Sequence, residues 1–318
     1  MPTDDSSPLA SLPSFQSTEN RASYPLLYVS QAGMISILLA HGIVIEMSND
    51  RCVRVVCHGK FAAFMSGRGA ASCIMHKKAR MLYTNDMVYT KFSVPASSDR
   101  LAIIGNEGIL FTMSHLNEAF LLSSHSKGPS AISLRSLDFS CGYLDCDFSI
   151  RLFYHEAQTG IECAITSKQI VREGSYNRRP DGMLVMRING IMVRQRGNGD
   201  TMVDARPRII KCSPSLCSVQ VCSPHINMGV QENEKAYVKQ DVKSVHVSPS
   251  GMVVSDGHCT TSMDHFGRIV RSNSNLYMYV ALPESATVED LLTSMPIEPP
   301  IVSDRHVPFR KCFELVGD

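Results

Sequence analysis

The sequence contains no tryptophan, and only 7% of its residues are aromatic. It has almost no net charge: 31 Lys and Arg stand against 30 Asp and Glu, a formal charge of +1. This balance excludes a globally basic nucleic-acid-binding protein and a strongly acidic, solvating chain. No uninterrupted run of about 18 apolar residues occurs, so we expect no transmembrane segment. Asn-x-Ser/Thr is also absent, which disfavours a glycosylated ectodomain.

The motifs of the common enzyme classes are missing as well. The glycines of SGRGAAS (66–72) resemble a phosphate-binding loop only superficially, because no Lys-Ser/Thr follows a G-x-x-x-x-G. There is no H-E-x-x-H, no G-x-S-x-G and no kinase set. Nucleotide-binding, hydrolase and protease enzymes usually carry one such motif, so the sequence predicts a protein that is not an enzyme.

The chain of 318 residues is 44% hydrophobic, which is enough for a folded core. Residues 1–24 are rich in Ser and Pro, with no basic start and no apolar core, so we expect a disordered tail and no signal peptide. The 11 cysteines are an odd number and cannot all pair within one chain. Reduced thiols are therefore expected, in an intracellular protein that is cytoplasmic rather than nuclear and is not secreted.

Short β-like segments separated by turns dominate the first half of the chain. In RCVRVVC (51–57), a period of two places Val53, Val55 and Cys57 on one face and Arg54 on the other. Asn49-Asp50 precedes this segment as a hairpin-type break. A helix is predicted at LNEAFLL (116–122), with Ser114 as its cap. The strands predicted here are 26–30, 34–39, 42–48, 51–57, 86–94, 101–104 and 108–113.

The second half continues in the same pattern. Its clearest hairpin is MLVMRINGIMVRQR (183–196), in which Asn189-Gly190 is the pair that a type I′ turn requires. A capping-box-like spacing predicts one helix at 287–294. Further strands are predicted at 147–154, 160–166, 244–247 and 252–255.

These patterns predict a mainly β fold: an antiparallel, β-rich protein of two lobes of short strands, with one or two short helices. Strands do not alternate with long helical segments, which disfavours a parallel sheet. The Ser/Gly/Pro stretch at 123–130 predicts a domain boundary. The expected division is a tail (1–24), an N-terminal β-rich domain (25–125), a C-terminal β-rich domain (130–283) and a short helix with a Pro-containing tail (284–318).

The hairpin carries the strongest functional signal. A two-residue turn places Ile188 opposite Ile191, so that Arg187, Arg194 and Arg196 share one face of the ribbon. Residues 168–211 hold ten basic and four acidic residues, and Tyr176 is their only aromatic. One hypothesis is a phosphate-binding β surface; the alternative is an arginine-rich solvated face, or one that pairs with acidic surface of the same protein. The candidate nucleic-acid contacts are Arg178, Arg179, Arg187, Arg194, Arg196, Arg206 and Arg208.

A second candidate site is KCSPSLCSVQVCSPH (211–225), with Cys212, Cys217, Cys222 and His225. Three thiolates and an imidazole are chemically suited to Zn²⁺, but the C-x4-C-x4-C-x2-H spacing lacks a tight C-x2-C knuckle. If LCSVQVC is a strand, Cys217 and Cys222 point to opposite faces. The four are therefore weak zinc candidates, with ordinary buried cysteines as the alternative, and no other cofactor is expected.

Three hypotheses about function follow. The first is a non-enzymatic structural or interaction protein, a scaffold or assembly component, that acts through strand edges and the basic face at 168–211. It predicts a protein partner or self-association into oligomers. The second is an RNA- or single-stranded nucleic-acid-binding protein, such as a viral non-structural or transport-type factor. The third is a thiol- or zinc-dependent enzyme, whose Cys/His candidates are Cys73 with His76, Cys57 with His58, and His258 with Cys259.

Overall fold

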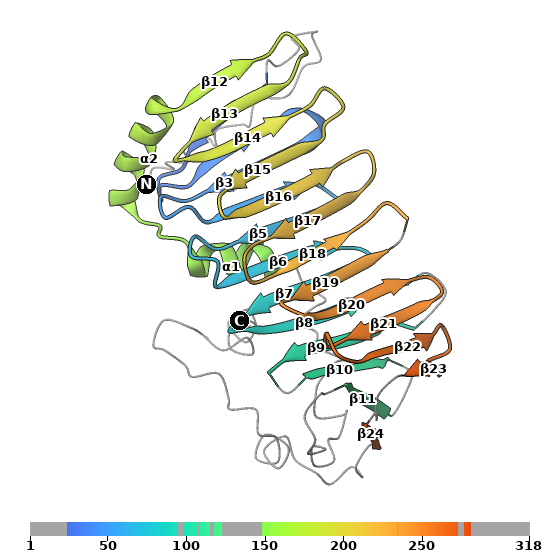
Figure 1. The fold of residues 1–318 in the computed structure, drawn as a ribbon. Coiled ribbons are helices and arrows are strands. Elements are labelled where there is room, and N and C mark those ends of the chain that lie inside the picture. Colours follow the sequence, from blue (N-terminus) through green and yellow to red (C-terminus); the bar gives the residue numbers. More distant parts are fainter. Residues whose placement is uncertain are drawn as a thin grey trace, which may run out of the picture.

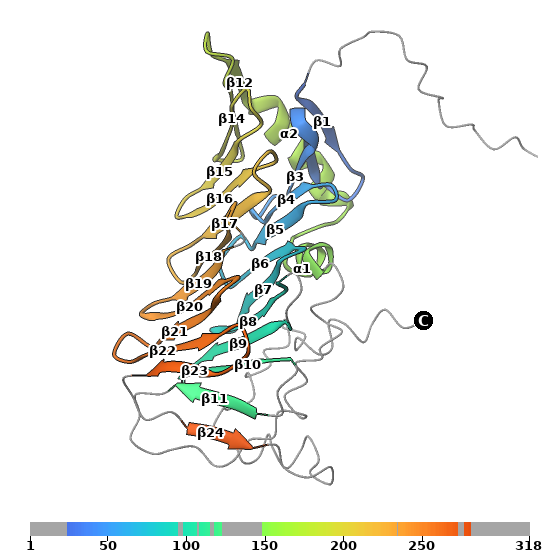
Figure 2. The same cartoon turned by 90° about the vertical axis from the view of Figure 1, so that its right-hand side faces the viewer.

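The computed structural model describes residues 24–94, 98–106, 108–114, 118–122, 148–233, 235–272 and 277–280. Two long antiparallel sheets lie face to face in these residues, and two α-helices lie beside them (Figures 1 and 2). This confirms the predicted mainly β, antiparallel fold class. Neither described helix has the length and hydrophobicity needed to cross a membrane.

The first sheet is a meander in which each strand pairs with the next along the chain, and a distant strand completes it. A 3-10 turn, Ala40–Gly42, connects its second and third strands. Its strands, in spatial order, are β1 (Leu26–Val29), β2 (Ile35–Leu38), β3 (Ile43–Met47), β4 (Val53–Cys57), β5 (Phe61–Met65), β6 (Ala71–His76), β7 (Ala79–Thr84), β8 (Met87–Phe92), β9 (Arg100–Gly105), β10 (Gly108–Met113), β11 (Glu118–Leu122) and β24 (Tyr277–Val280).

The second sheet is a meander throughout. Its successive strands advance along the long axis of the molecule in the same direction as those of the first sheet (Figure 1). Its strands are β12 (Ser175–Arg178), β13 (Leu184–Ile188), β14 (Ile191–Gln195), β15 (Thr201–Ala205), β16 (Arg208–Ser213), β17 (Ser218–Cys222), β18 (Asn227–Val230), β19 (Ala236–Gln240), β20 (Lys243–Ser248), β21 (Gly251–Ser255), β22 (Thr260–Asp264) and β23 (Ile269–Ser272).

The main core lies between the two sheets and follows the period of two in their sequences. Val53, Val55 and Cys57 point into it from β4, as predicted, and Val193 and Val203 point into it from the second sheet. Side chains of both sheets belong to one continuous buried cluster. Burial of each such aliphatic side chain contributes about 1.5–3 kcal/mol, so the two sheets stabilise each other.

Polar side chains join the sheets at their turns, in reciprocal pairs. His41 Nε2 lies 2.9 Å from the carbonyl oxygen of Gly197, and Asn189 Nδ2 donates to the carbonyl of Asn49 at 2.9 Å. His41 and Asn189 occupy equivalent turns, β2–β3 and β13–β14, and both have positive φ, 62° and 53°. The same contact is therefore made once from each sheet.

Two further reciprocal contacts lie further along the sheets. In each, a cationic side chain of one sheet donates to a turn carbonyl of the other. The contacts are Lys60 to Pro214 with Arg208 to Ser66, and Arg100 to Ser248 with Lys243 to Gly105. Exchanging the two sheets maps each contact onto its counterpart. The sheets are therefore related by a pseudo-two-fold rotation about the long axis of the molecule.

Helix α1 (Phe148–Glu156) breaks this symmetry, because it covers the outer face of the first sheet. The Phe153 ring meets Phe64 of β5 edge-on, with centroids 6.2 Å apart and planes at 88°. Arg54 Nε of β4 donates to Ser149 Oγ at 2.9 Å. Together with Phe148, these residues form a second buried cluster outside the first sheet.

Helix α2 (Ile161–Glu173) lies at the end of the sheets that holds β1 and β12 (Figure 1). Its Ser167 hydroxyl donates to the carbonyl of Gly33, in the β1–β2 turn, and to Asn49 Oδ1. A Cβ on Gly33 would lie 2.5 Å from Cβ of Cys163, so the helix is seated directly on this glycine.

The strands predicted at 147–154 and 160–166 are wrong, because these segments form α1 and α2. Apolar and β-branched residues in short runs suit either structure, and packing decides between them. In α2, Ala164 and Ser167 are buried whereas Ile161 and Ile165 are exposed, which is a helical period.

The helix predicted at 116–122 is also wrong, because Glu118–Leu122 is strand β11. Ala119 and Phe120 are buried on opposite faces of this strand, and Phe120 stacks on Phe111 of β10 at 5.7 Å. The strands that were not predicted are β5, β6, β7, β12, β15, β16, β18, β19, β22, β23 and β24. The N-terminal tail up to residue 23, the boundary at 123–130 and the helix at 287–294 lie outside the described residues. The division into domains stays a prediction.

Candidate functional site

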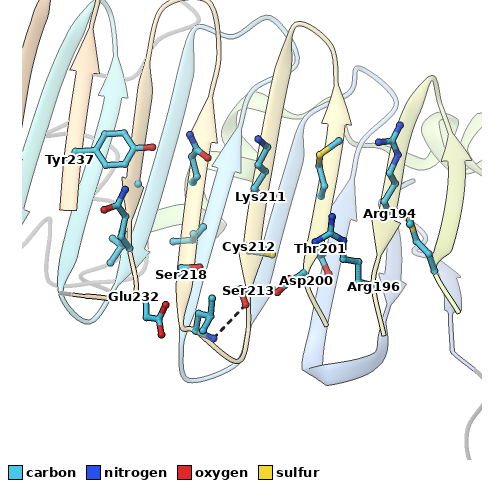
Figure 3. A pocket seen from close by; sticks show the side chains of 18 residues that line it. Arg194, Arg196, Asp200, Thr201, Lys211, Cys212, Ser213, Ser218, Glu232 and Tyr237 are labelled. Carbon is cyan, nitrogen blue, oxygen red and sulfur yellow. Dashed lines mark hydrogen bonds between the residues drawn. The ribbon is translucent and has the colours of Figure 1, made fainter. Parts of the chain in front are cut away.

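The outer face of the second sheet carries a shallow groove of about 590 Å³ that crosses its strands (Figure 3). The pairing registers place one outward side chain of each strand beside the next, so that a single row runs across the sheet. From β14 to β19 this row consists of Arg194, Met202, Lys211, Gln220, Gly229 and Tyr237. We call this feature the outer groove.

Two cations of the outer groove, Arg194 and Lys211, have no carboxylate partner in the described part of the chain, because neither belongs to the ion pairs found there. Arg194 Nη2 instead contacts Met192 Sδ at 3.3 Å. The third groove cation, Arg196, acts on the Asp200 carboxylate and helps to lower its pKa. Cations without a carboxylate partner raise the local positive potential, and such a surface attracts a ligand that carries carboxylates or phosphates.

The opposite side of the groove carries two carboxylates, Asp200 and Glu232, with Arg196 beside the first of them. Asp200 and Glu232 lie along its lower level in Figure 3, whereas Arg194, Lys211 and Tyr237 lie along the upper level. Hydrogen bonds from the Ser213 hydroxyl and an Asn198 amide hold the pKa of Asp200 below its usual range. The groove is therefore lined by charges of both signs.

Tyr237 closes one end of the outer groove, and its neighbours hold its ring in a fixed position. Tyr237 lies over Gly229, where a Cβ would come within 3.0 Å of its ring. Its hydroxyl donates to Asn227 Oδ1 at 3.1 Å, and Gln220 Nε2 donates to the same oxygen at 3.1 Å. The imidazole of His246 stacks against the ring with centroids 6.0 Å apart and planes at 21°. The missing side chain at Gly229 thus allows a fixed aromatic surface on the sheet.

The outer groove is the pseudo-two-fold counterpart of the surface of the first sheet on which α1 packs. The equivalent outer row of the first sheet is Glu46, Arg54, Phe64, Cys73, Leu82 and Tyr89. Both rows end in a tyrosine. Where the first sheet places Phe64 and Leu82, the second places Lys211 and Gly229. The first row packs beneath α1 and is apolar at its centre, whereas no described element covers the second.

Of the predicted site residues, the structure brings together the three arginines of the hairpin. The register confirms that Ile188 lies opposite Ile191 and Val185 opposite Arg194. Arg187, Arg194 and Arg196 consequently lie on one side of the β13–β14 ribbon, and two of them line the outer groove.

The other four predicted arginines do not join them. Arg178 pairs with Leu184, on the face that points toward the first sheet, and donates to the Tyr24 carbonyl at 3.1 Å. Arg179 lies in the β12–β13 turn, and Arg206 forms an ion pair with Asp204 at 3.2 Å. Arg208 is only 4% exposed and donates to the Ser66 carbonyl, so it connects the sheets.

Sequence reasoning missed five of the six residues of the row: Met202, Lys211, Gln220, Gly229 and Tyr237. The signal that finds them is the register itself. Extending the hairpin pairing of Arg194 from strand to strand leads through Lys211 to Tyr237, which lies 43 residues further along the chain.

The four zinc candidates are not brought together as a metal site. Cys212 points into the core, and burial raises the pKa of its thiol to about 12. Cys222 lies on the opposite face of the second sheet, beside Asn227. His225 is exposed in the β17–β18 turn. Within the described ranges, no three His, Cys, Asp or Glu side chains are grouped as metal ligands would be.

One Cys/His contact does form: Cys217 Sγ lies 3.5 Å from His76 Nε2. The Lys78 backbone N–H donates to His76 Nδ1 at 3.1 Å, so the ring proton is on Nε2, which donates to the Cys217 carbonyl at 3.0 Å. The only lone pair of the His76 ring that could accept a proton is on Nδ1, which faces the Lys78 N–H and not the Cys217 sulfur. This histidine therefore cannot remove the thiol proton. Geometry therefore gives His76 the role of joining the two sheets.

This histidine predicts a specific pH dependence of stability. Burial lowers the pKa of His76 from its ordinary value of 6.5, so below pH 6.5 the unfolded chain binds a proton that the folded protein does not. The free energy of unfolding is therefore expected to fall as the pH drops from 7 to 5. His76→Gln should flatten that part of the profile in urea titrations. An unchanged slope would contradict the assignment.

The described residues form a two-sheet, antiparallel β protein in which α1 covers the outer face of the first sheet and no described element covers that of the second. The chain belongs to the family described as "Domain of unknown function (DUF8796)", whose model matches residues 25–273. No curated protein matches the sequence.

Several solved structures show a distant likeness. The chain is 9% identical to the TCP10 domain of Danio rerio CPAP (TM-score 0.22, covering 79% of this chain and 100% of that one). It is 8% identical to the same domain in complex with a STIL peptide (0.17, 76% and 99%). It is 9% identical to the Drosophila melanogaster SAS-4 (dCPAP) TCP domain with a proline-rich motif of Ana2 (0.11, 83% and 99%). TM-scores this low establish neither fold nor function for this chain.

Proposed function

We propose that this protein is a non-catalytic interaction module that docks a protein partner on the outer groove. One observation carries the proposal: of two pseudo-equivalent sheet faces, one is packed beneath a helix of the chain, and the other presents two cations, Arg194 and Lys211, that form no ion pair with any described residue, beside a fixed aromatic ring. Groups placed for contact but without a contact in the described chain are typical of a binding surface.

The lining of the groove favours a protein over a nucleic acid. A phosphate backbone presents one negative charge per nucleotide, so it would meet Asp200 and Glu232 as well as Arg194 and Lys211. A protein segment places its carboxylates individually and can avoid the acidic side. Exposed Leu216, which also lines the groove, offers a contact to an apolar side chain.

A catalytic function has less support. The Cys217–His76 contact lacks a basic nitrogen directed at the sulfur, and burial raises the pKa of Cys52 and of Cys212 to about 12. Thiols of such high pKa are poor nucleophiles at neutral pH, because the reactive species is the thiolate.

A paired-variant purification tests the proposal. Arg194→Ser/Lys211→Ser removes two cations from the groove, and Lys168→Ser/Arg172→Ser removes two exposed cations from α2 as the matched control. Each tagged protein is purified from lysates of cells that express it, with and without nuclease treatment. Co-purifying proteins are quantified by mass spectrometry. We expect at least one protein to be recovered about tenfold less with the groove variant and unchanged with the control.

Identical recoveries from the two variants would refute docking on this face. A species lost on nuclease treatment, with no protein affected by the groove substitutions, would instead favour nucleic acid as the ligand.

A further inference from the structure

We infer that the partner segment held in the outer groove is a short acidic amphipathic helix, seated where the pseudo-two-fold axis would place a second copy of α1. This inference rests on the proposed function and specifies its ligand. It starts from the one occupied example of this site, which is the outer face of the first sheet.

On the first sheet, α1 packs against β4, β5 and β6. Ser149 contacts Arg54 on β4, and four residues later Phe153 contacts Phe64 on β5. The equivalent position on the second sheet covers β15, β16 and β17, which form the floor of the outer groove.

The second surface is more positive than the first, because two of three exchanges add positive charge and one removes it. Met202 replaces Arg54, and Lys211 replaces Phe64, while Arg194 stands where the first sheet has Glu46. An apolar helix such as α1 would bury the Lys211 ammonium without a partner, which is costly. A helix with carboxylates at the matching positions would pair with both cations instead.

The spacing of the groove residues specifies the helix. Arg194, on β14 at the edge of this position, and Lys211 lie two strands apart, about 9.5 Å, so a helix that runs across the strands would face them with residues i and i+7, which lie about 10.5 Å apart on one face. Met202 lies between the two cations, below positions i+3 and i+4. The expected pattern is therefore an acidic residue at i, an apolar residue at i+3 or i+4, and an acidic residue at i+7.

Fluorescence anisotropy with synthetic probes tests this inference on the full chain. The probe is a labelled 18-residue Ala-based helix with Glu at i and i+7 and Leu at i+3. Three comparison probes replace both Glu by Gln, place Pro at the centre of the helix, or replace both Glu by Lys. A 12-nucleotide oligouridine is the nucleic-acid probe.

We expect the Glu helix to bind, and the Gln and Pro probes to bind about tenfold more weakly. Arg194→Glu/Lys211→Glu should abolish binding of the Glu helix and create binding of the Lys helix. Because this rescue requires a folded groove, it separates charge pairing from misfolding. Lys168→Glu/Arg172→Glu should leave all affinities unchanged.

Equal binding of the Pro and Glu probes would overturn the helical ligand, and preferential binding of oligouridine would overturn the protein ligand. If no peptide binds but Arg194→Ser/Lys211→Ser still loses a partner in cells, only the acidic helix is wrong. If neither effect appears, the proposed function fails as well.

Discussion

Replacing Arg100 with methionine is expected to lower the free energy of unfolding by about 3 kcal/mol, because it removes the donors of three turn carbonyls. Arg100 is fully buried, and its guanidinium donates to the carbonyls of Ser248, Pro249 and Gly251 in the β20–β21 turn. Burial lowers the pKa of Arg100, which forms no ion pair with any described residue that would offset this effect. Urea unfolding followed by circular dichroism measures the loss.

Two matched variants make this prediction specific. Arg172→Met makes the same chemical change on an exposed helix position and should cost less than about 0.5 kcal/mol. Arg100→Lys should retain part of the stability, because Lys243 makes the pseudo-equivalent contact with the Gly105 carbonyl. Equal losses for Arg100→Met and Arg172→Met would show that this turn does not depend on the buried cation.

The sequence predicted local pairing well, because local pairing depends on neighbouring residues. Asn189-Gly190 determined the turn of the β13–β14 hairpin, and its register placed Arg187 and Arg194 on one face, as the structure confirms. The alternation in 51–57 likewise identified the inward side chains of β4. In each case the period of two and the turn residues contain the whole signal.

The two helices could not be separated from strands in this way. The segment FSIRLFYHE becomes helical because Phe148 and Phe153 bury against Phe64, a residue more than 80 positions earlier in the chain. Short apolar segments take the structure that their partner surface selects, and that surface was unknown from the sequence. The pseudo-two-fold relation between the sheets could not be predicted from the sequence either, because it appears only in contacts between the sheets and in the strand registers.

The candidate site shows the same division. Arg194 and Arg196 were found from one hairpin, but the groove they line extends over six strands. Tyr237 lines the groove because five successive pairing registers align its side chain with that of Arg194 in one row across the sheet. Arg208 was misplaced for the opposite reason: it belongs to a segment rich in basic residues, but its side chain points between the sheets. Charge composition locates a basic region, and packing decides which of its residues reach the surface.

The asymmetry between the two outer faces leads to the second large effect. Phe153→Ala is expected to cost about 3 kcal/mol, because the fully buried Phe153 ring anchors α1 on Phe64. Ile150→Ala, at a 44% exposed position of the same helix, should cost less than about 1 kcal/mol. Urea unfolding of both variants measures the difference.

Loss of the Phe153 anchor should also uncover Phe64 and Leu82, so the variant should bind a hydrophobic dye under native conditions, whereas Ile150→Ala should not. Similar unfolding free energies for the two variants would mean that α1 is not held by this contact. The surface of the first sheet beneath α1 would then give no reason to expect a second helix on the outer groove, which is its pseudo-symmetric equivalent.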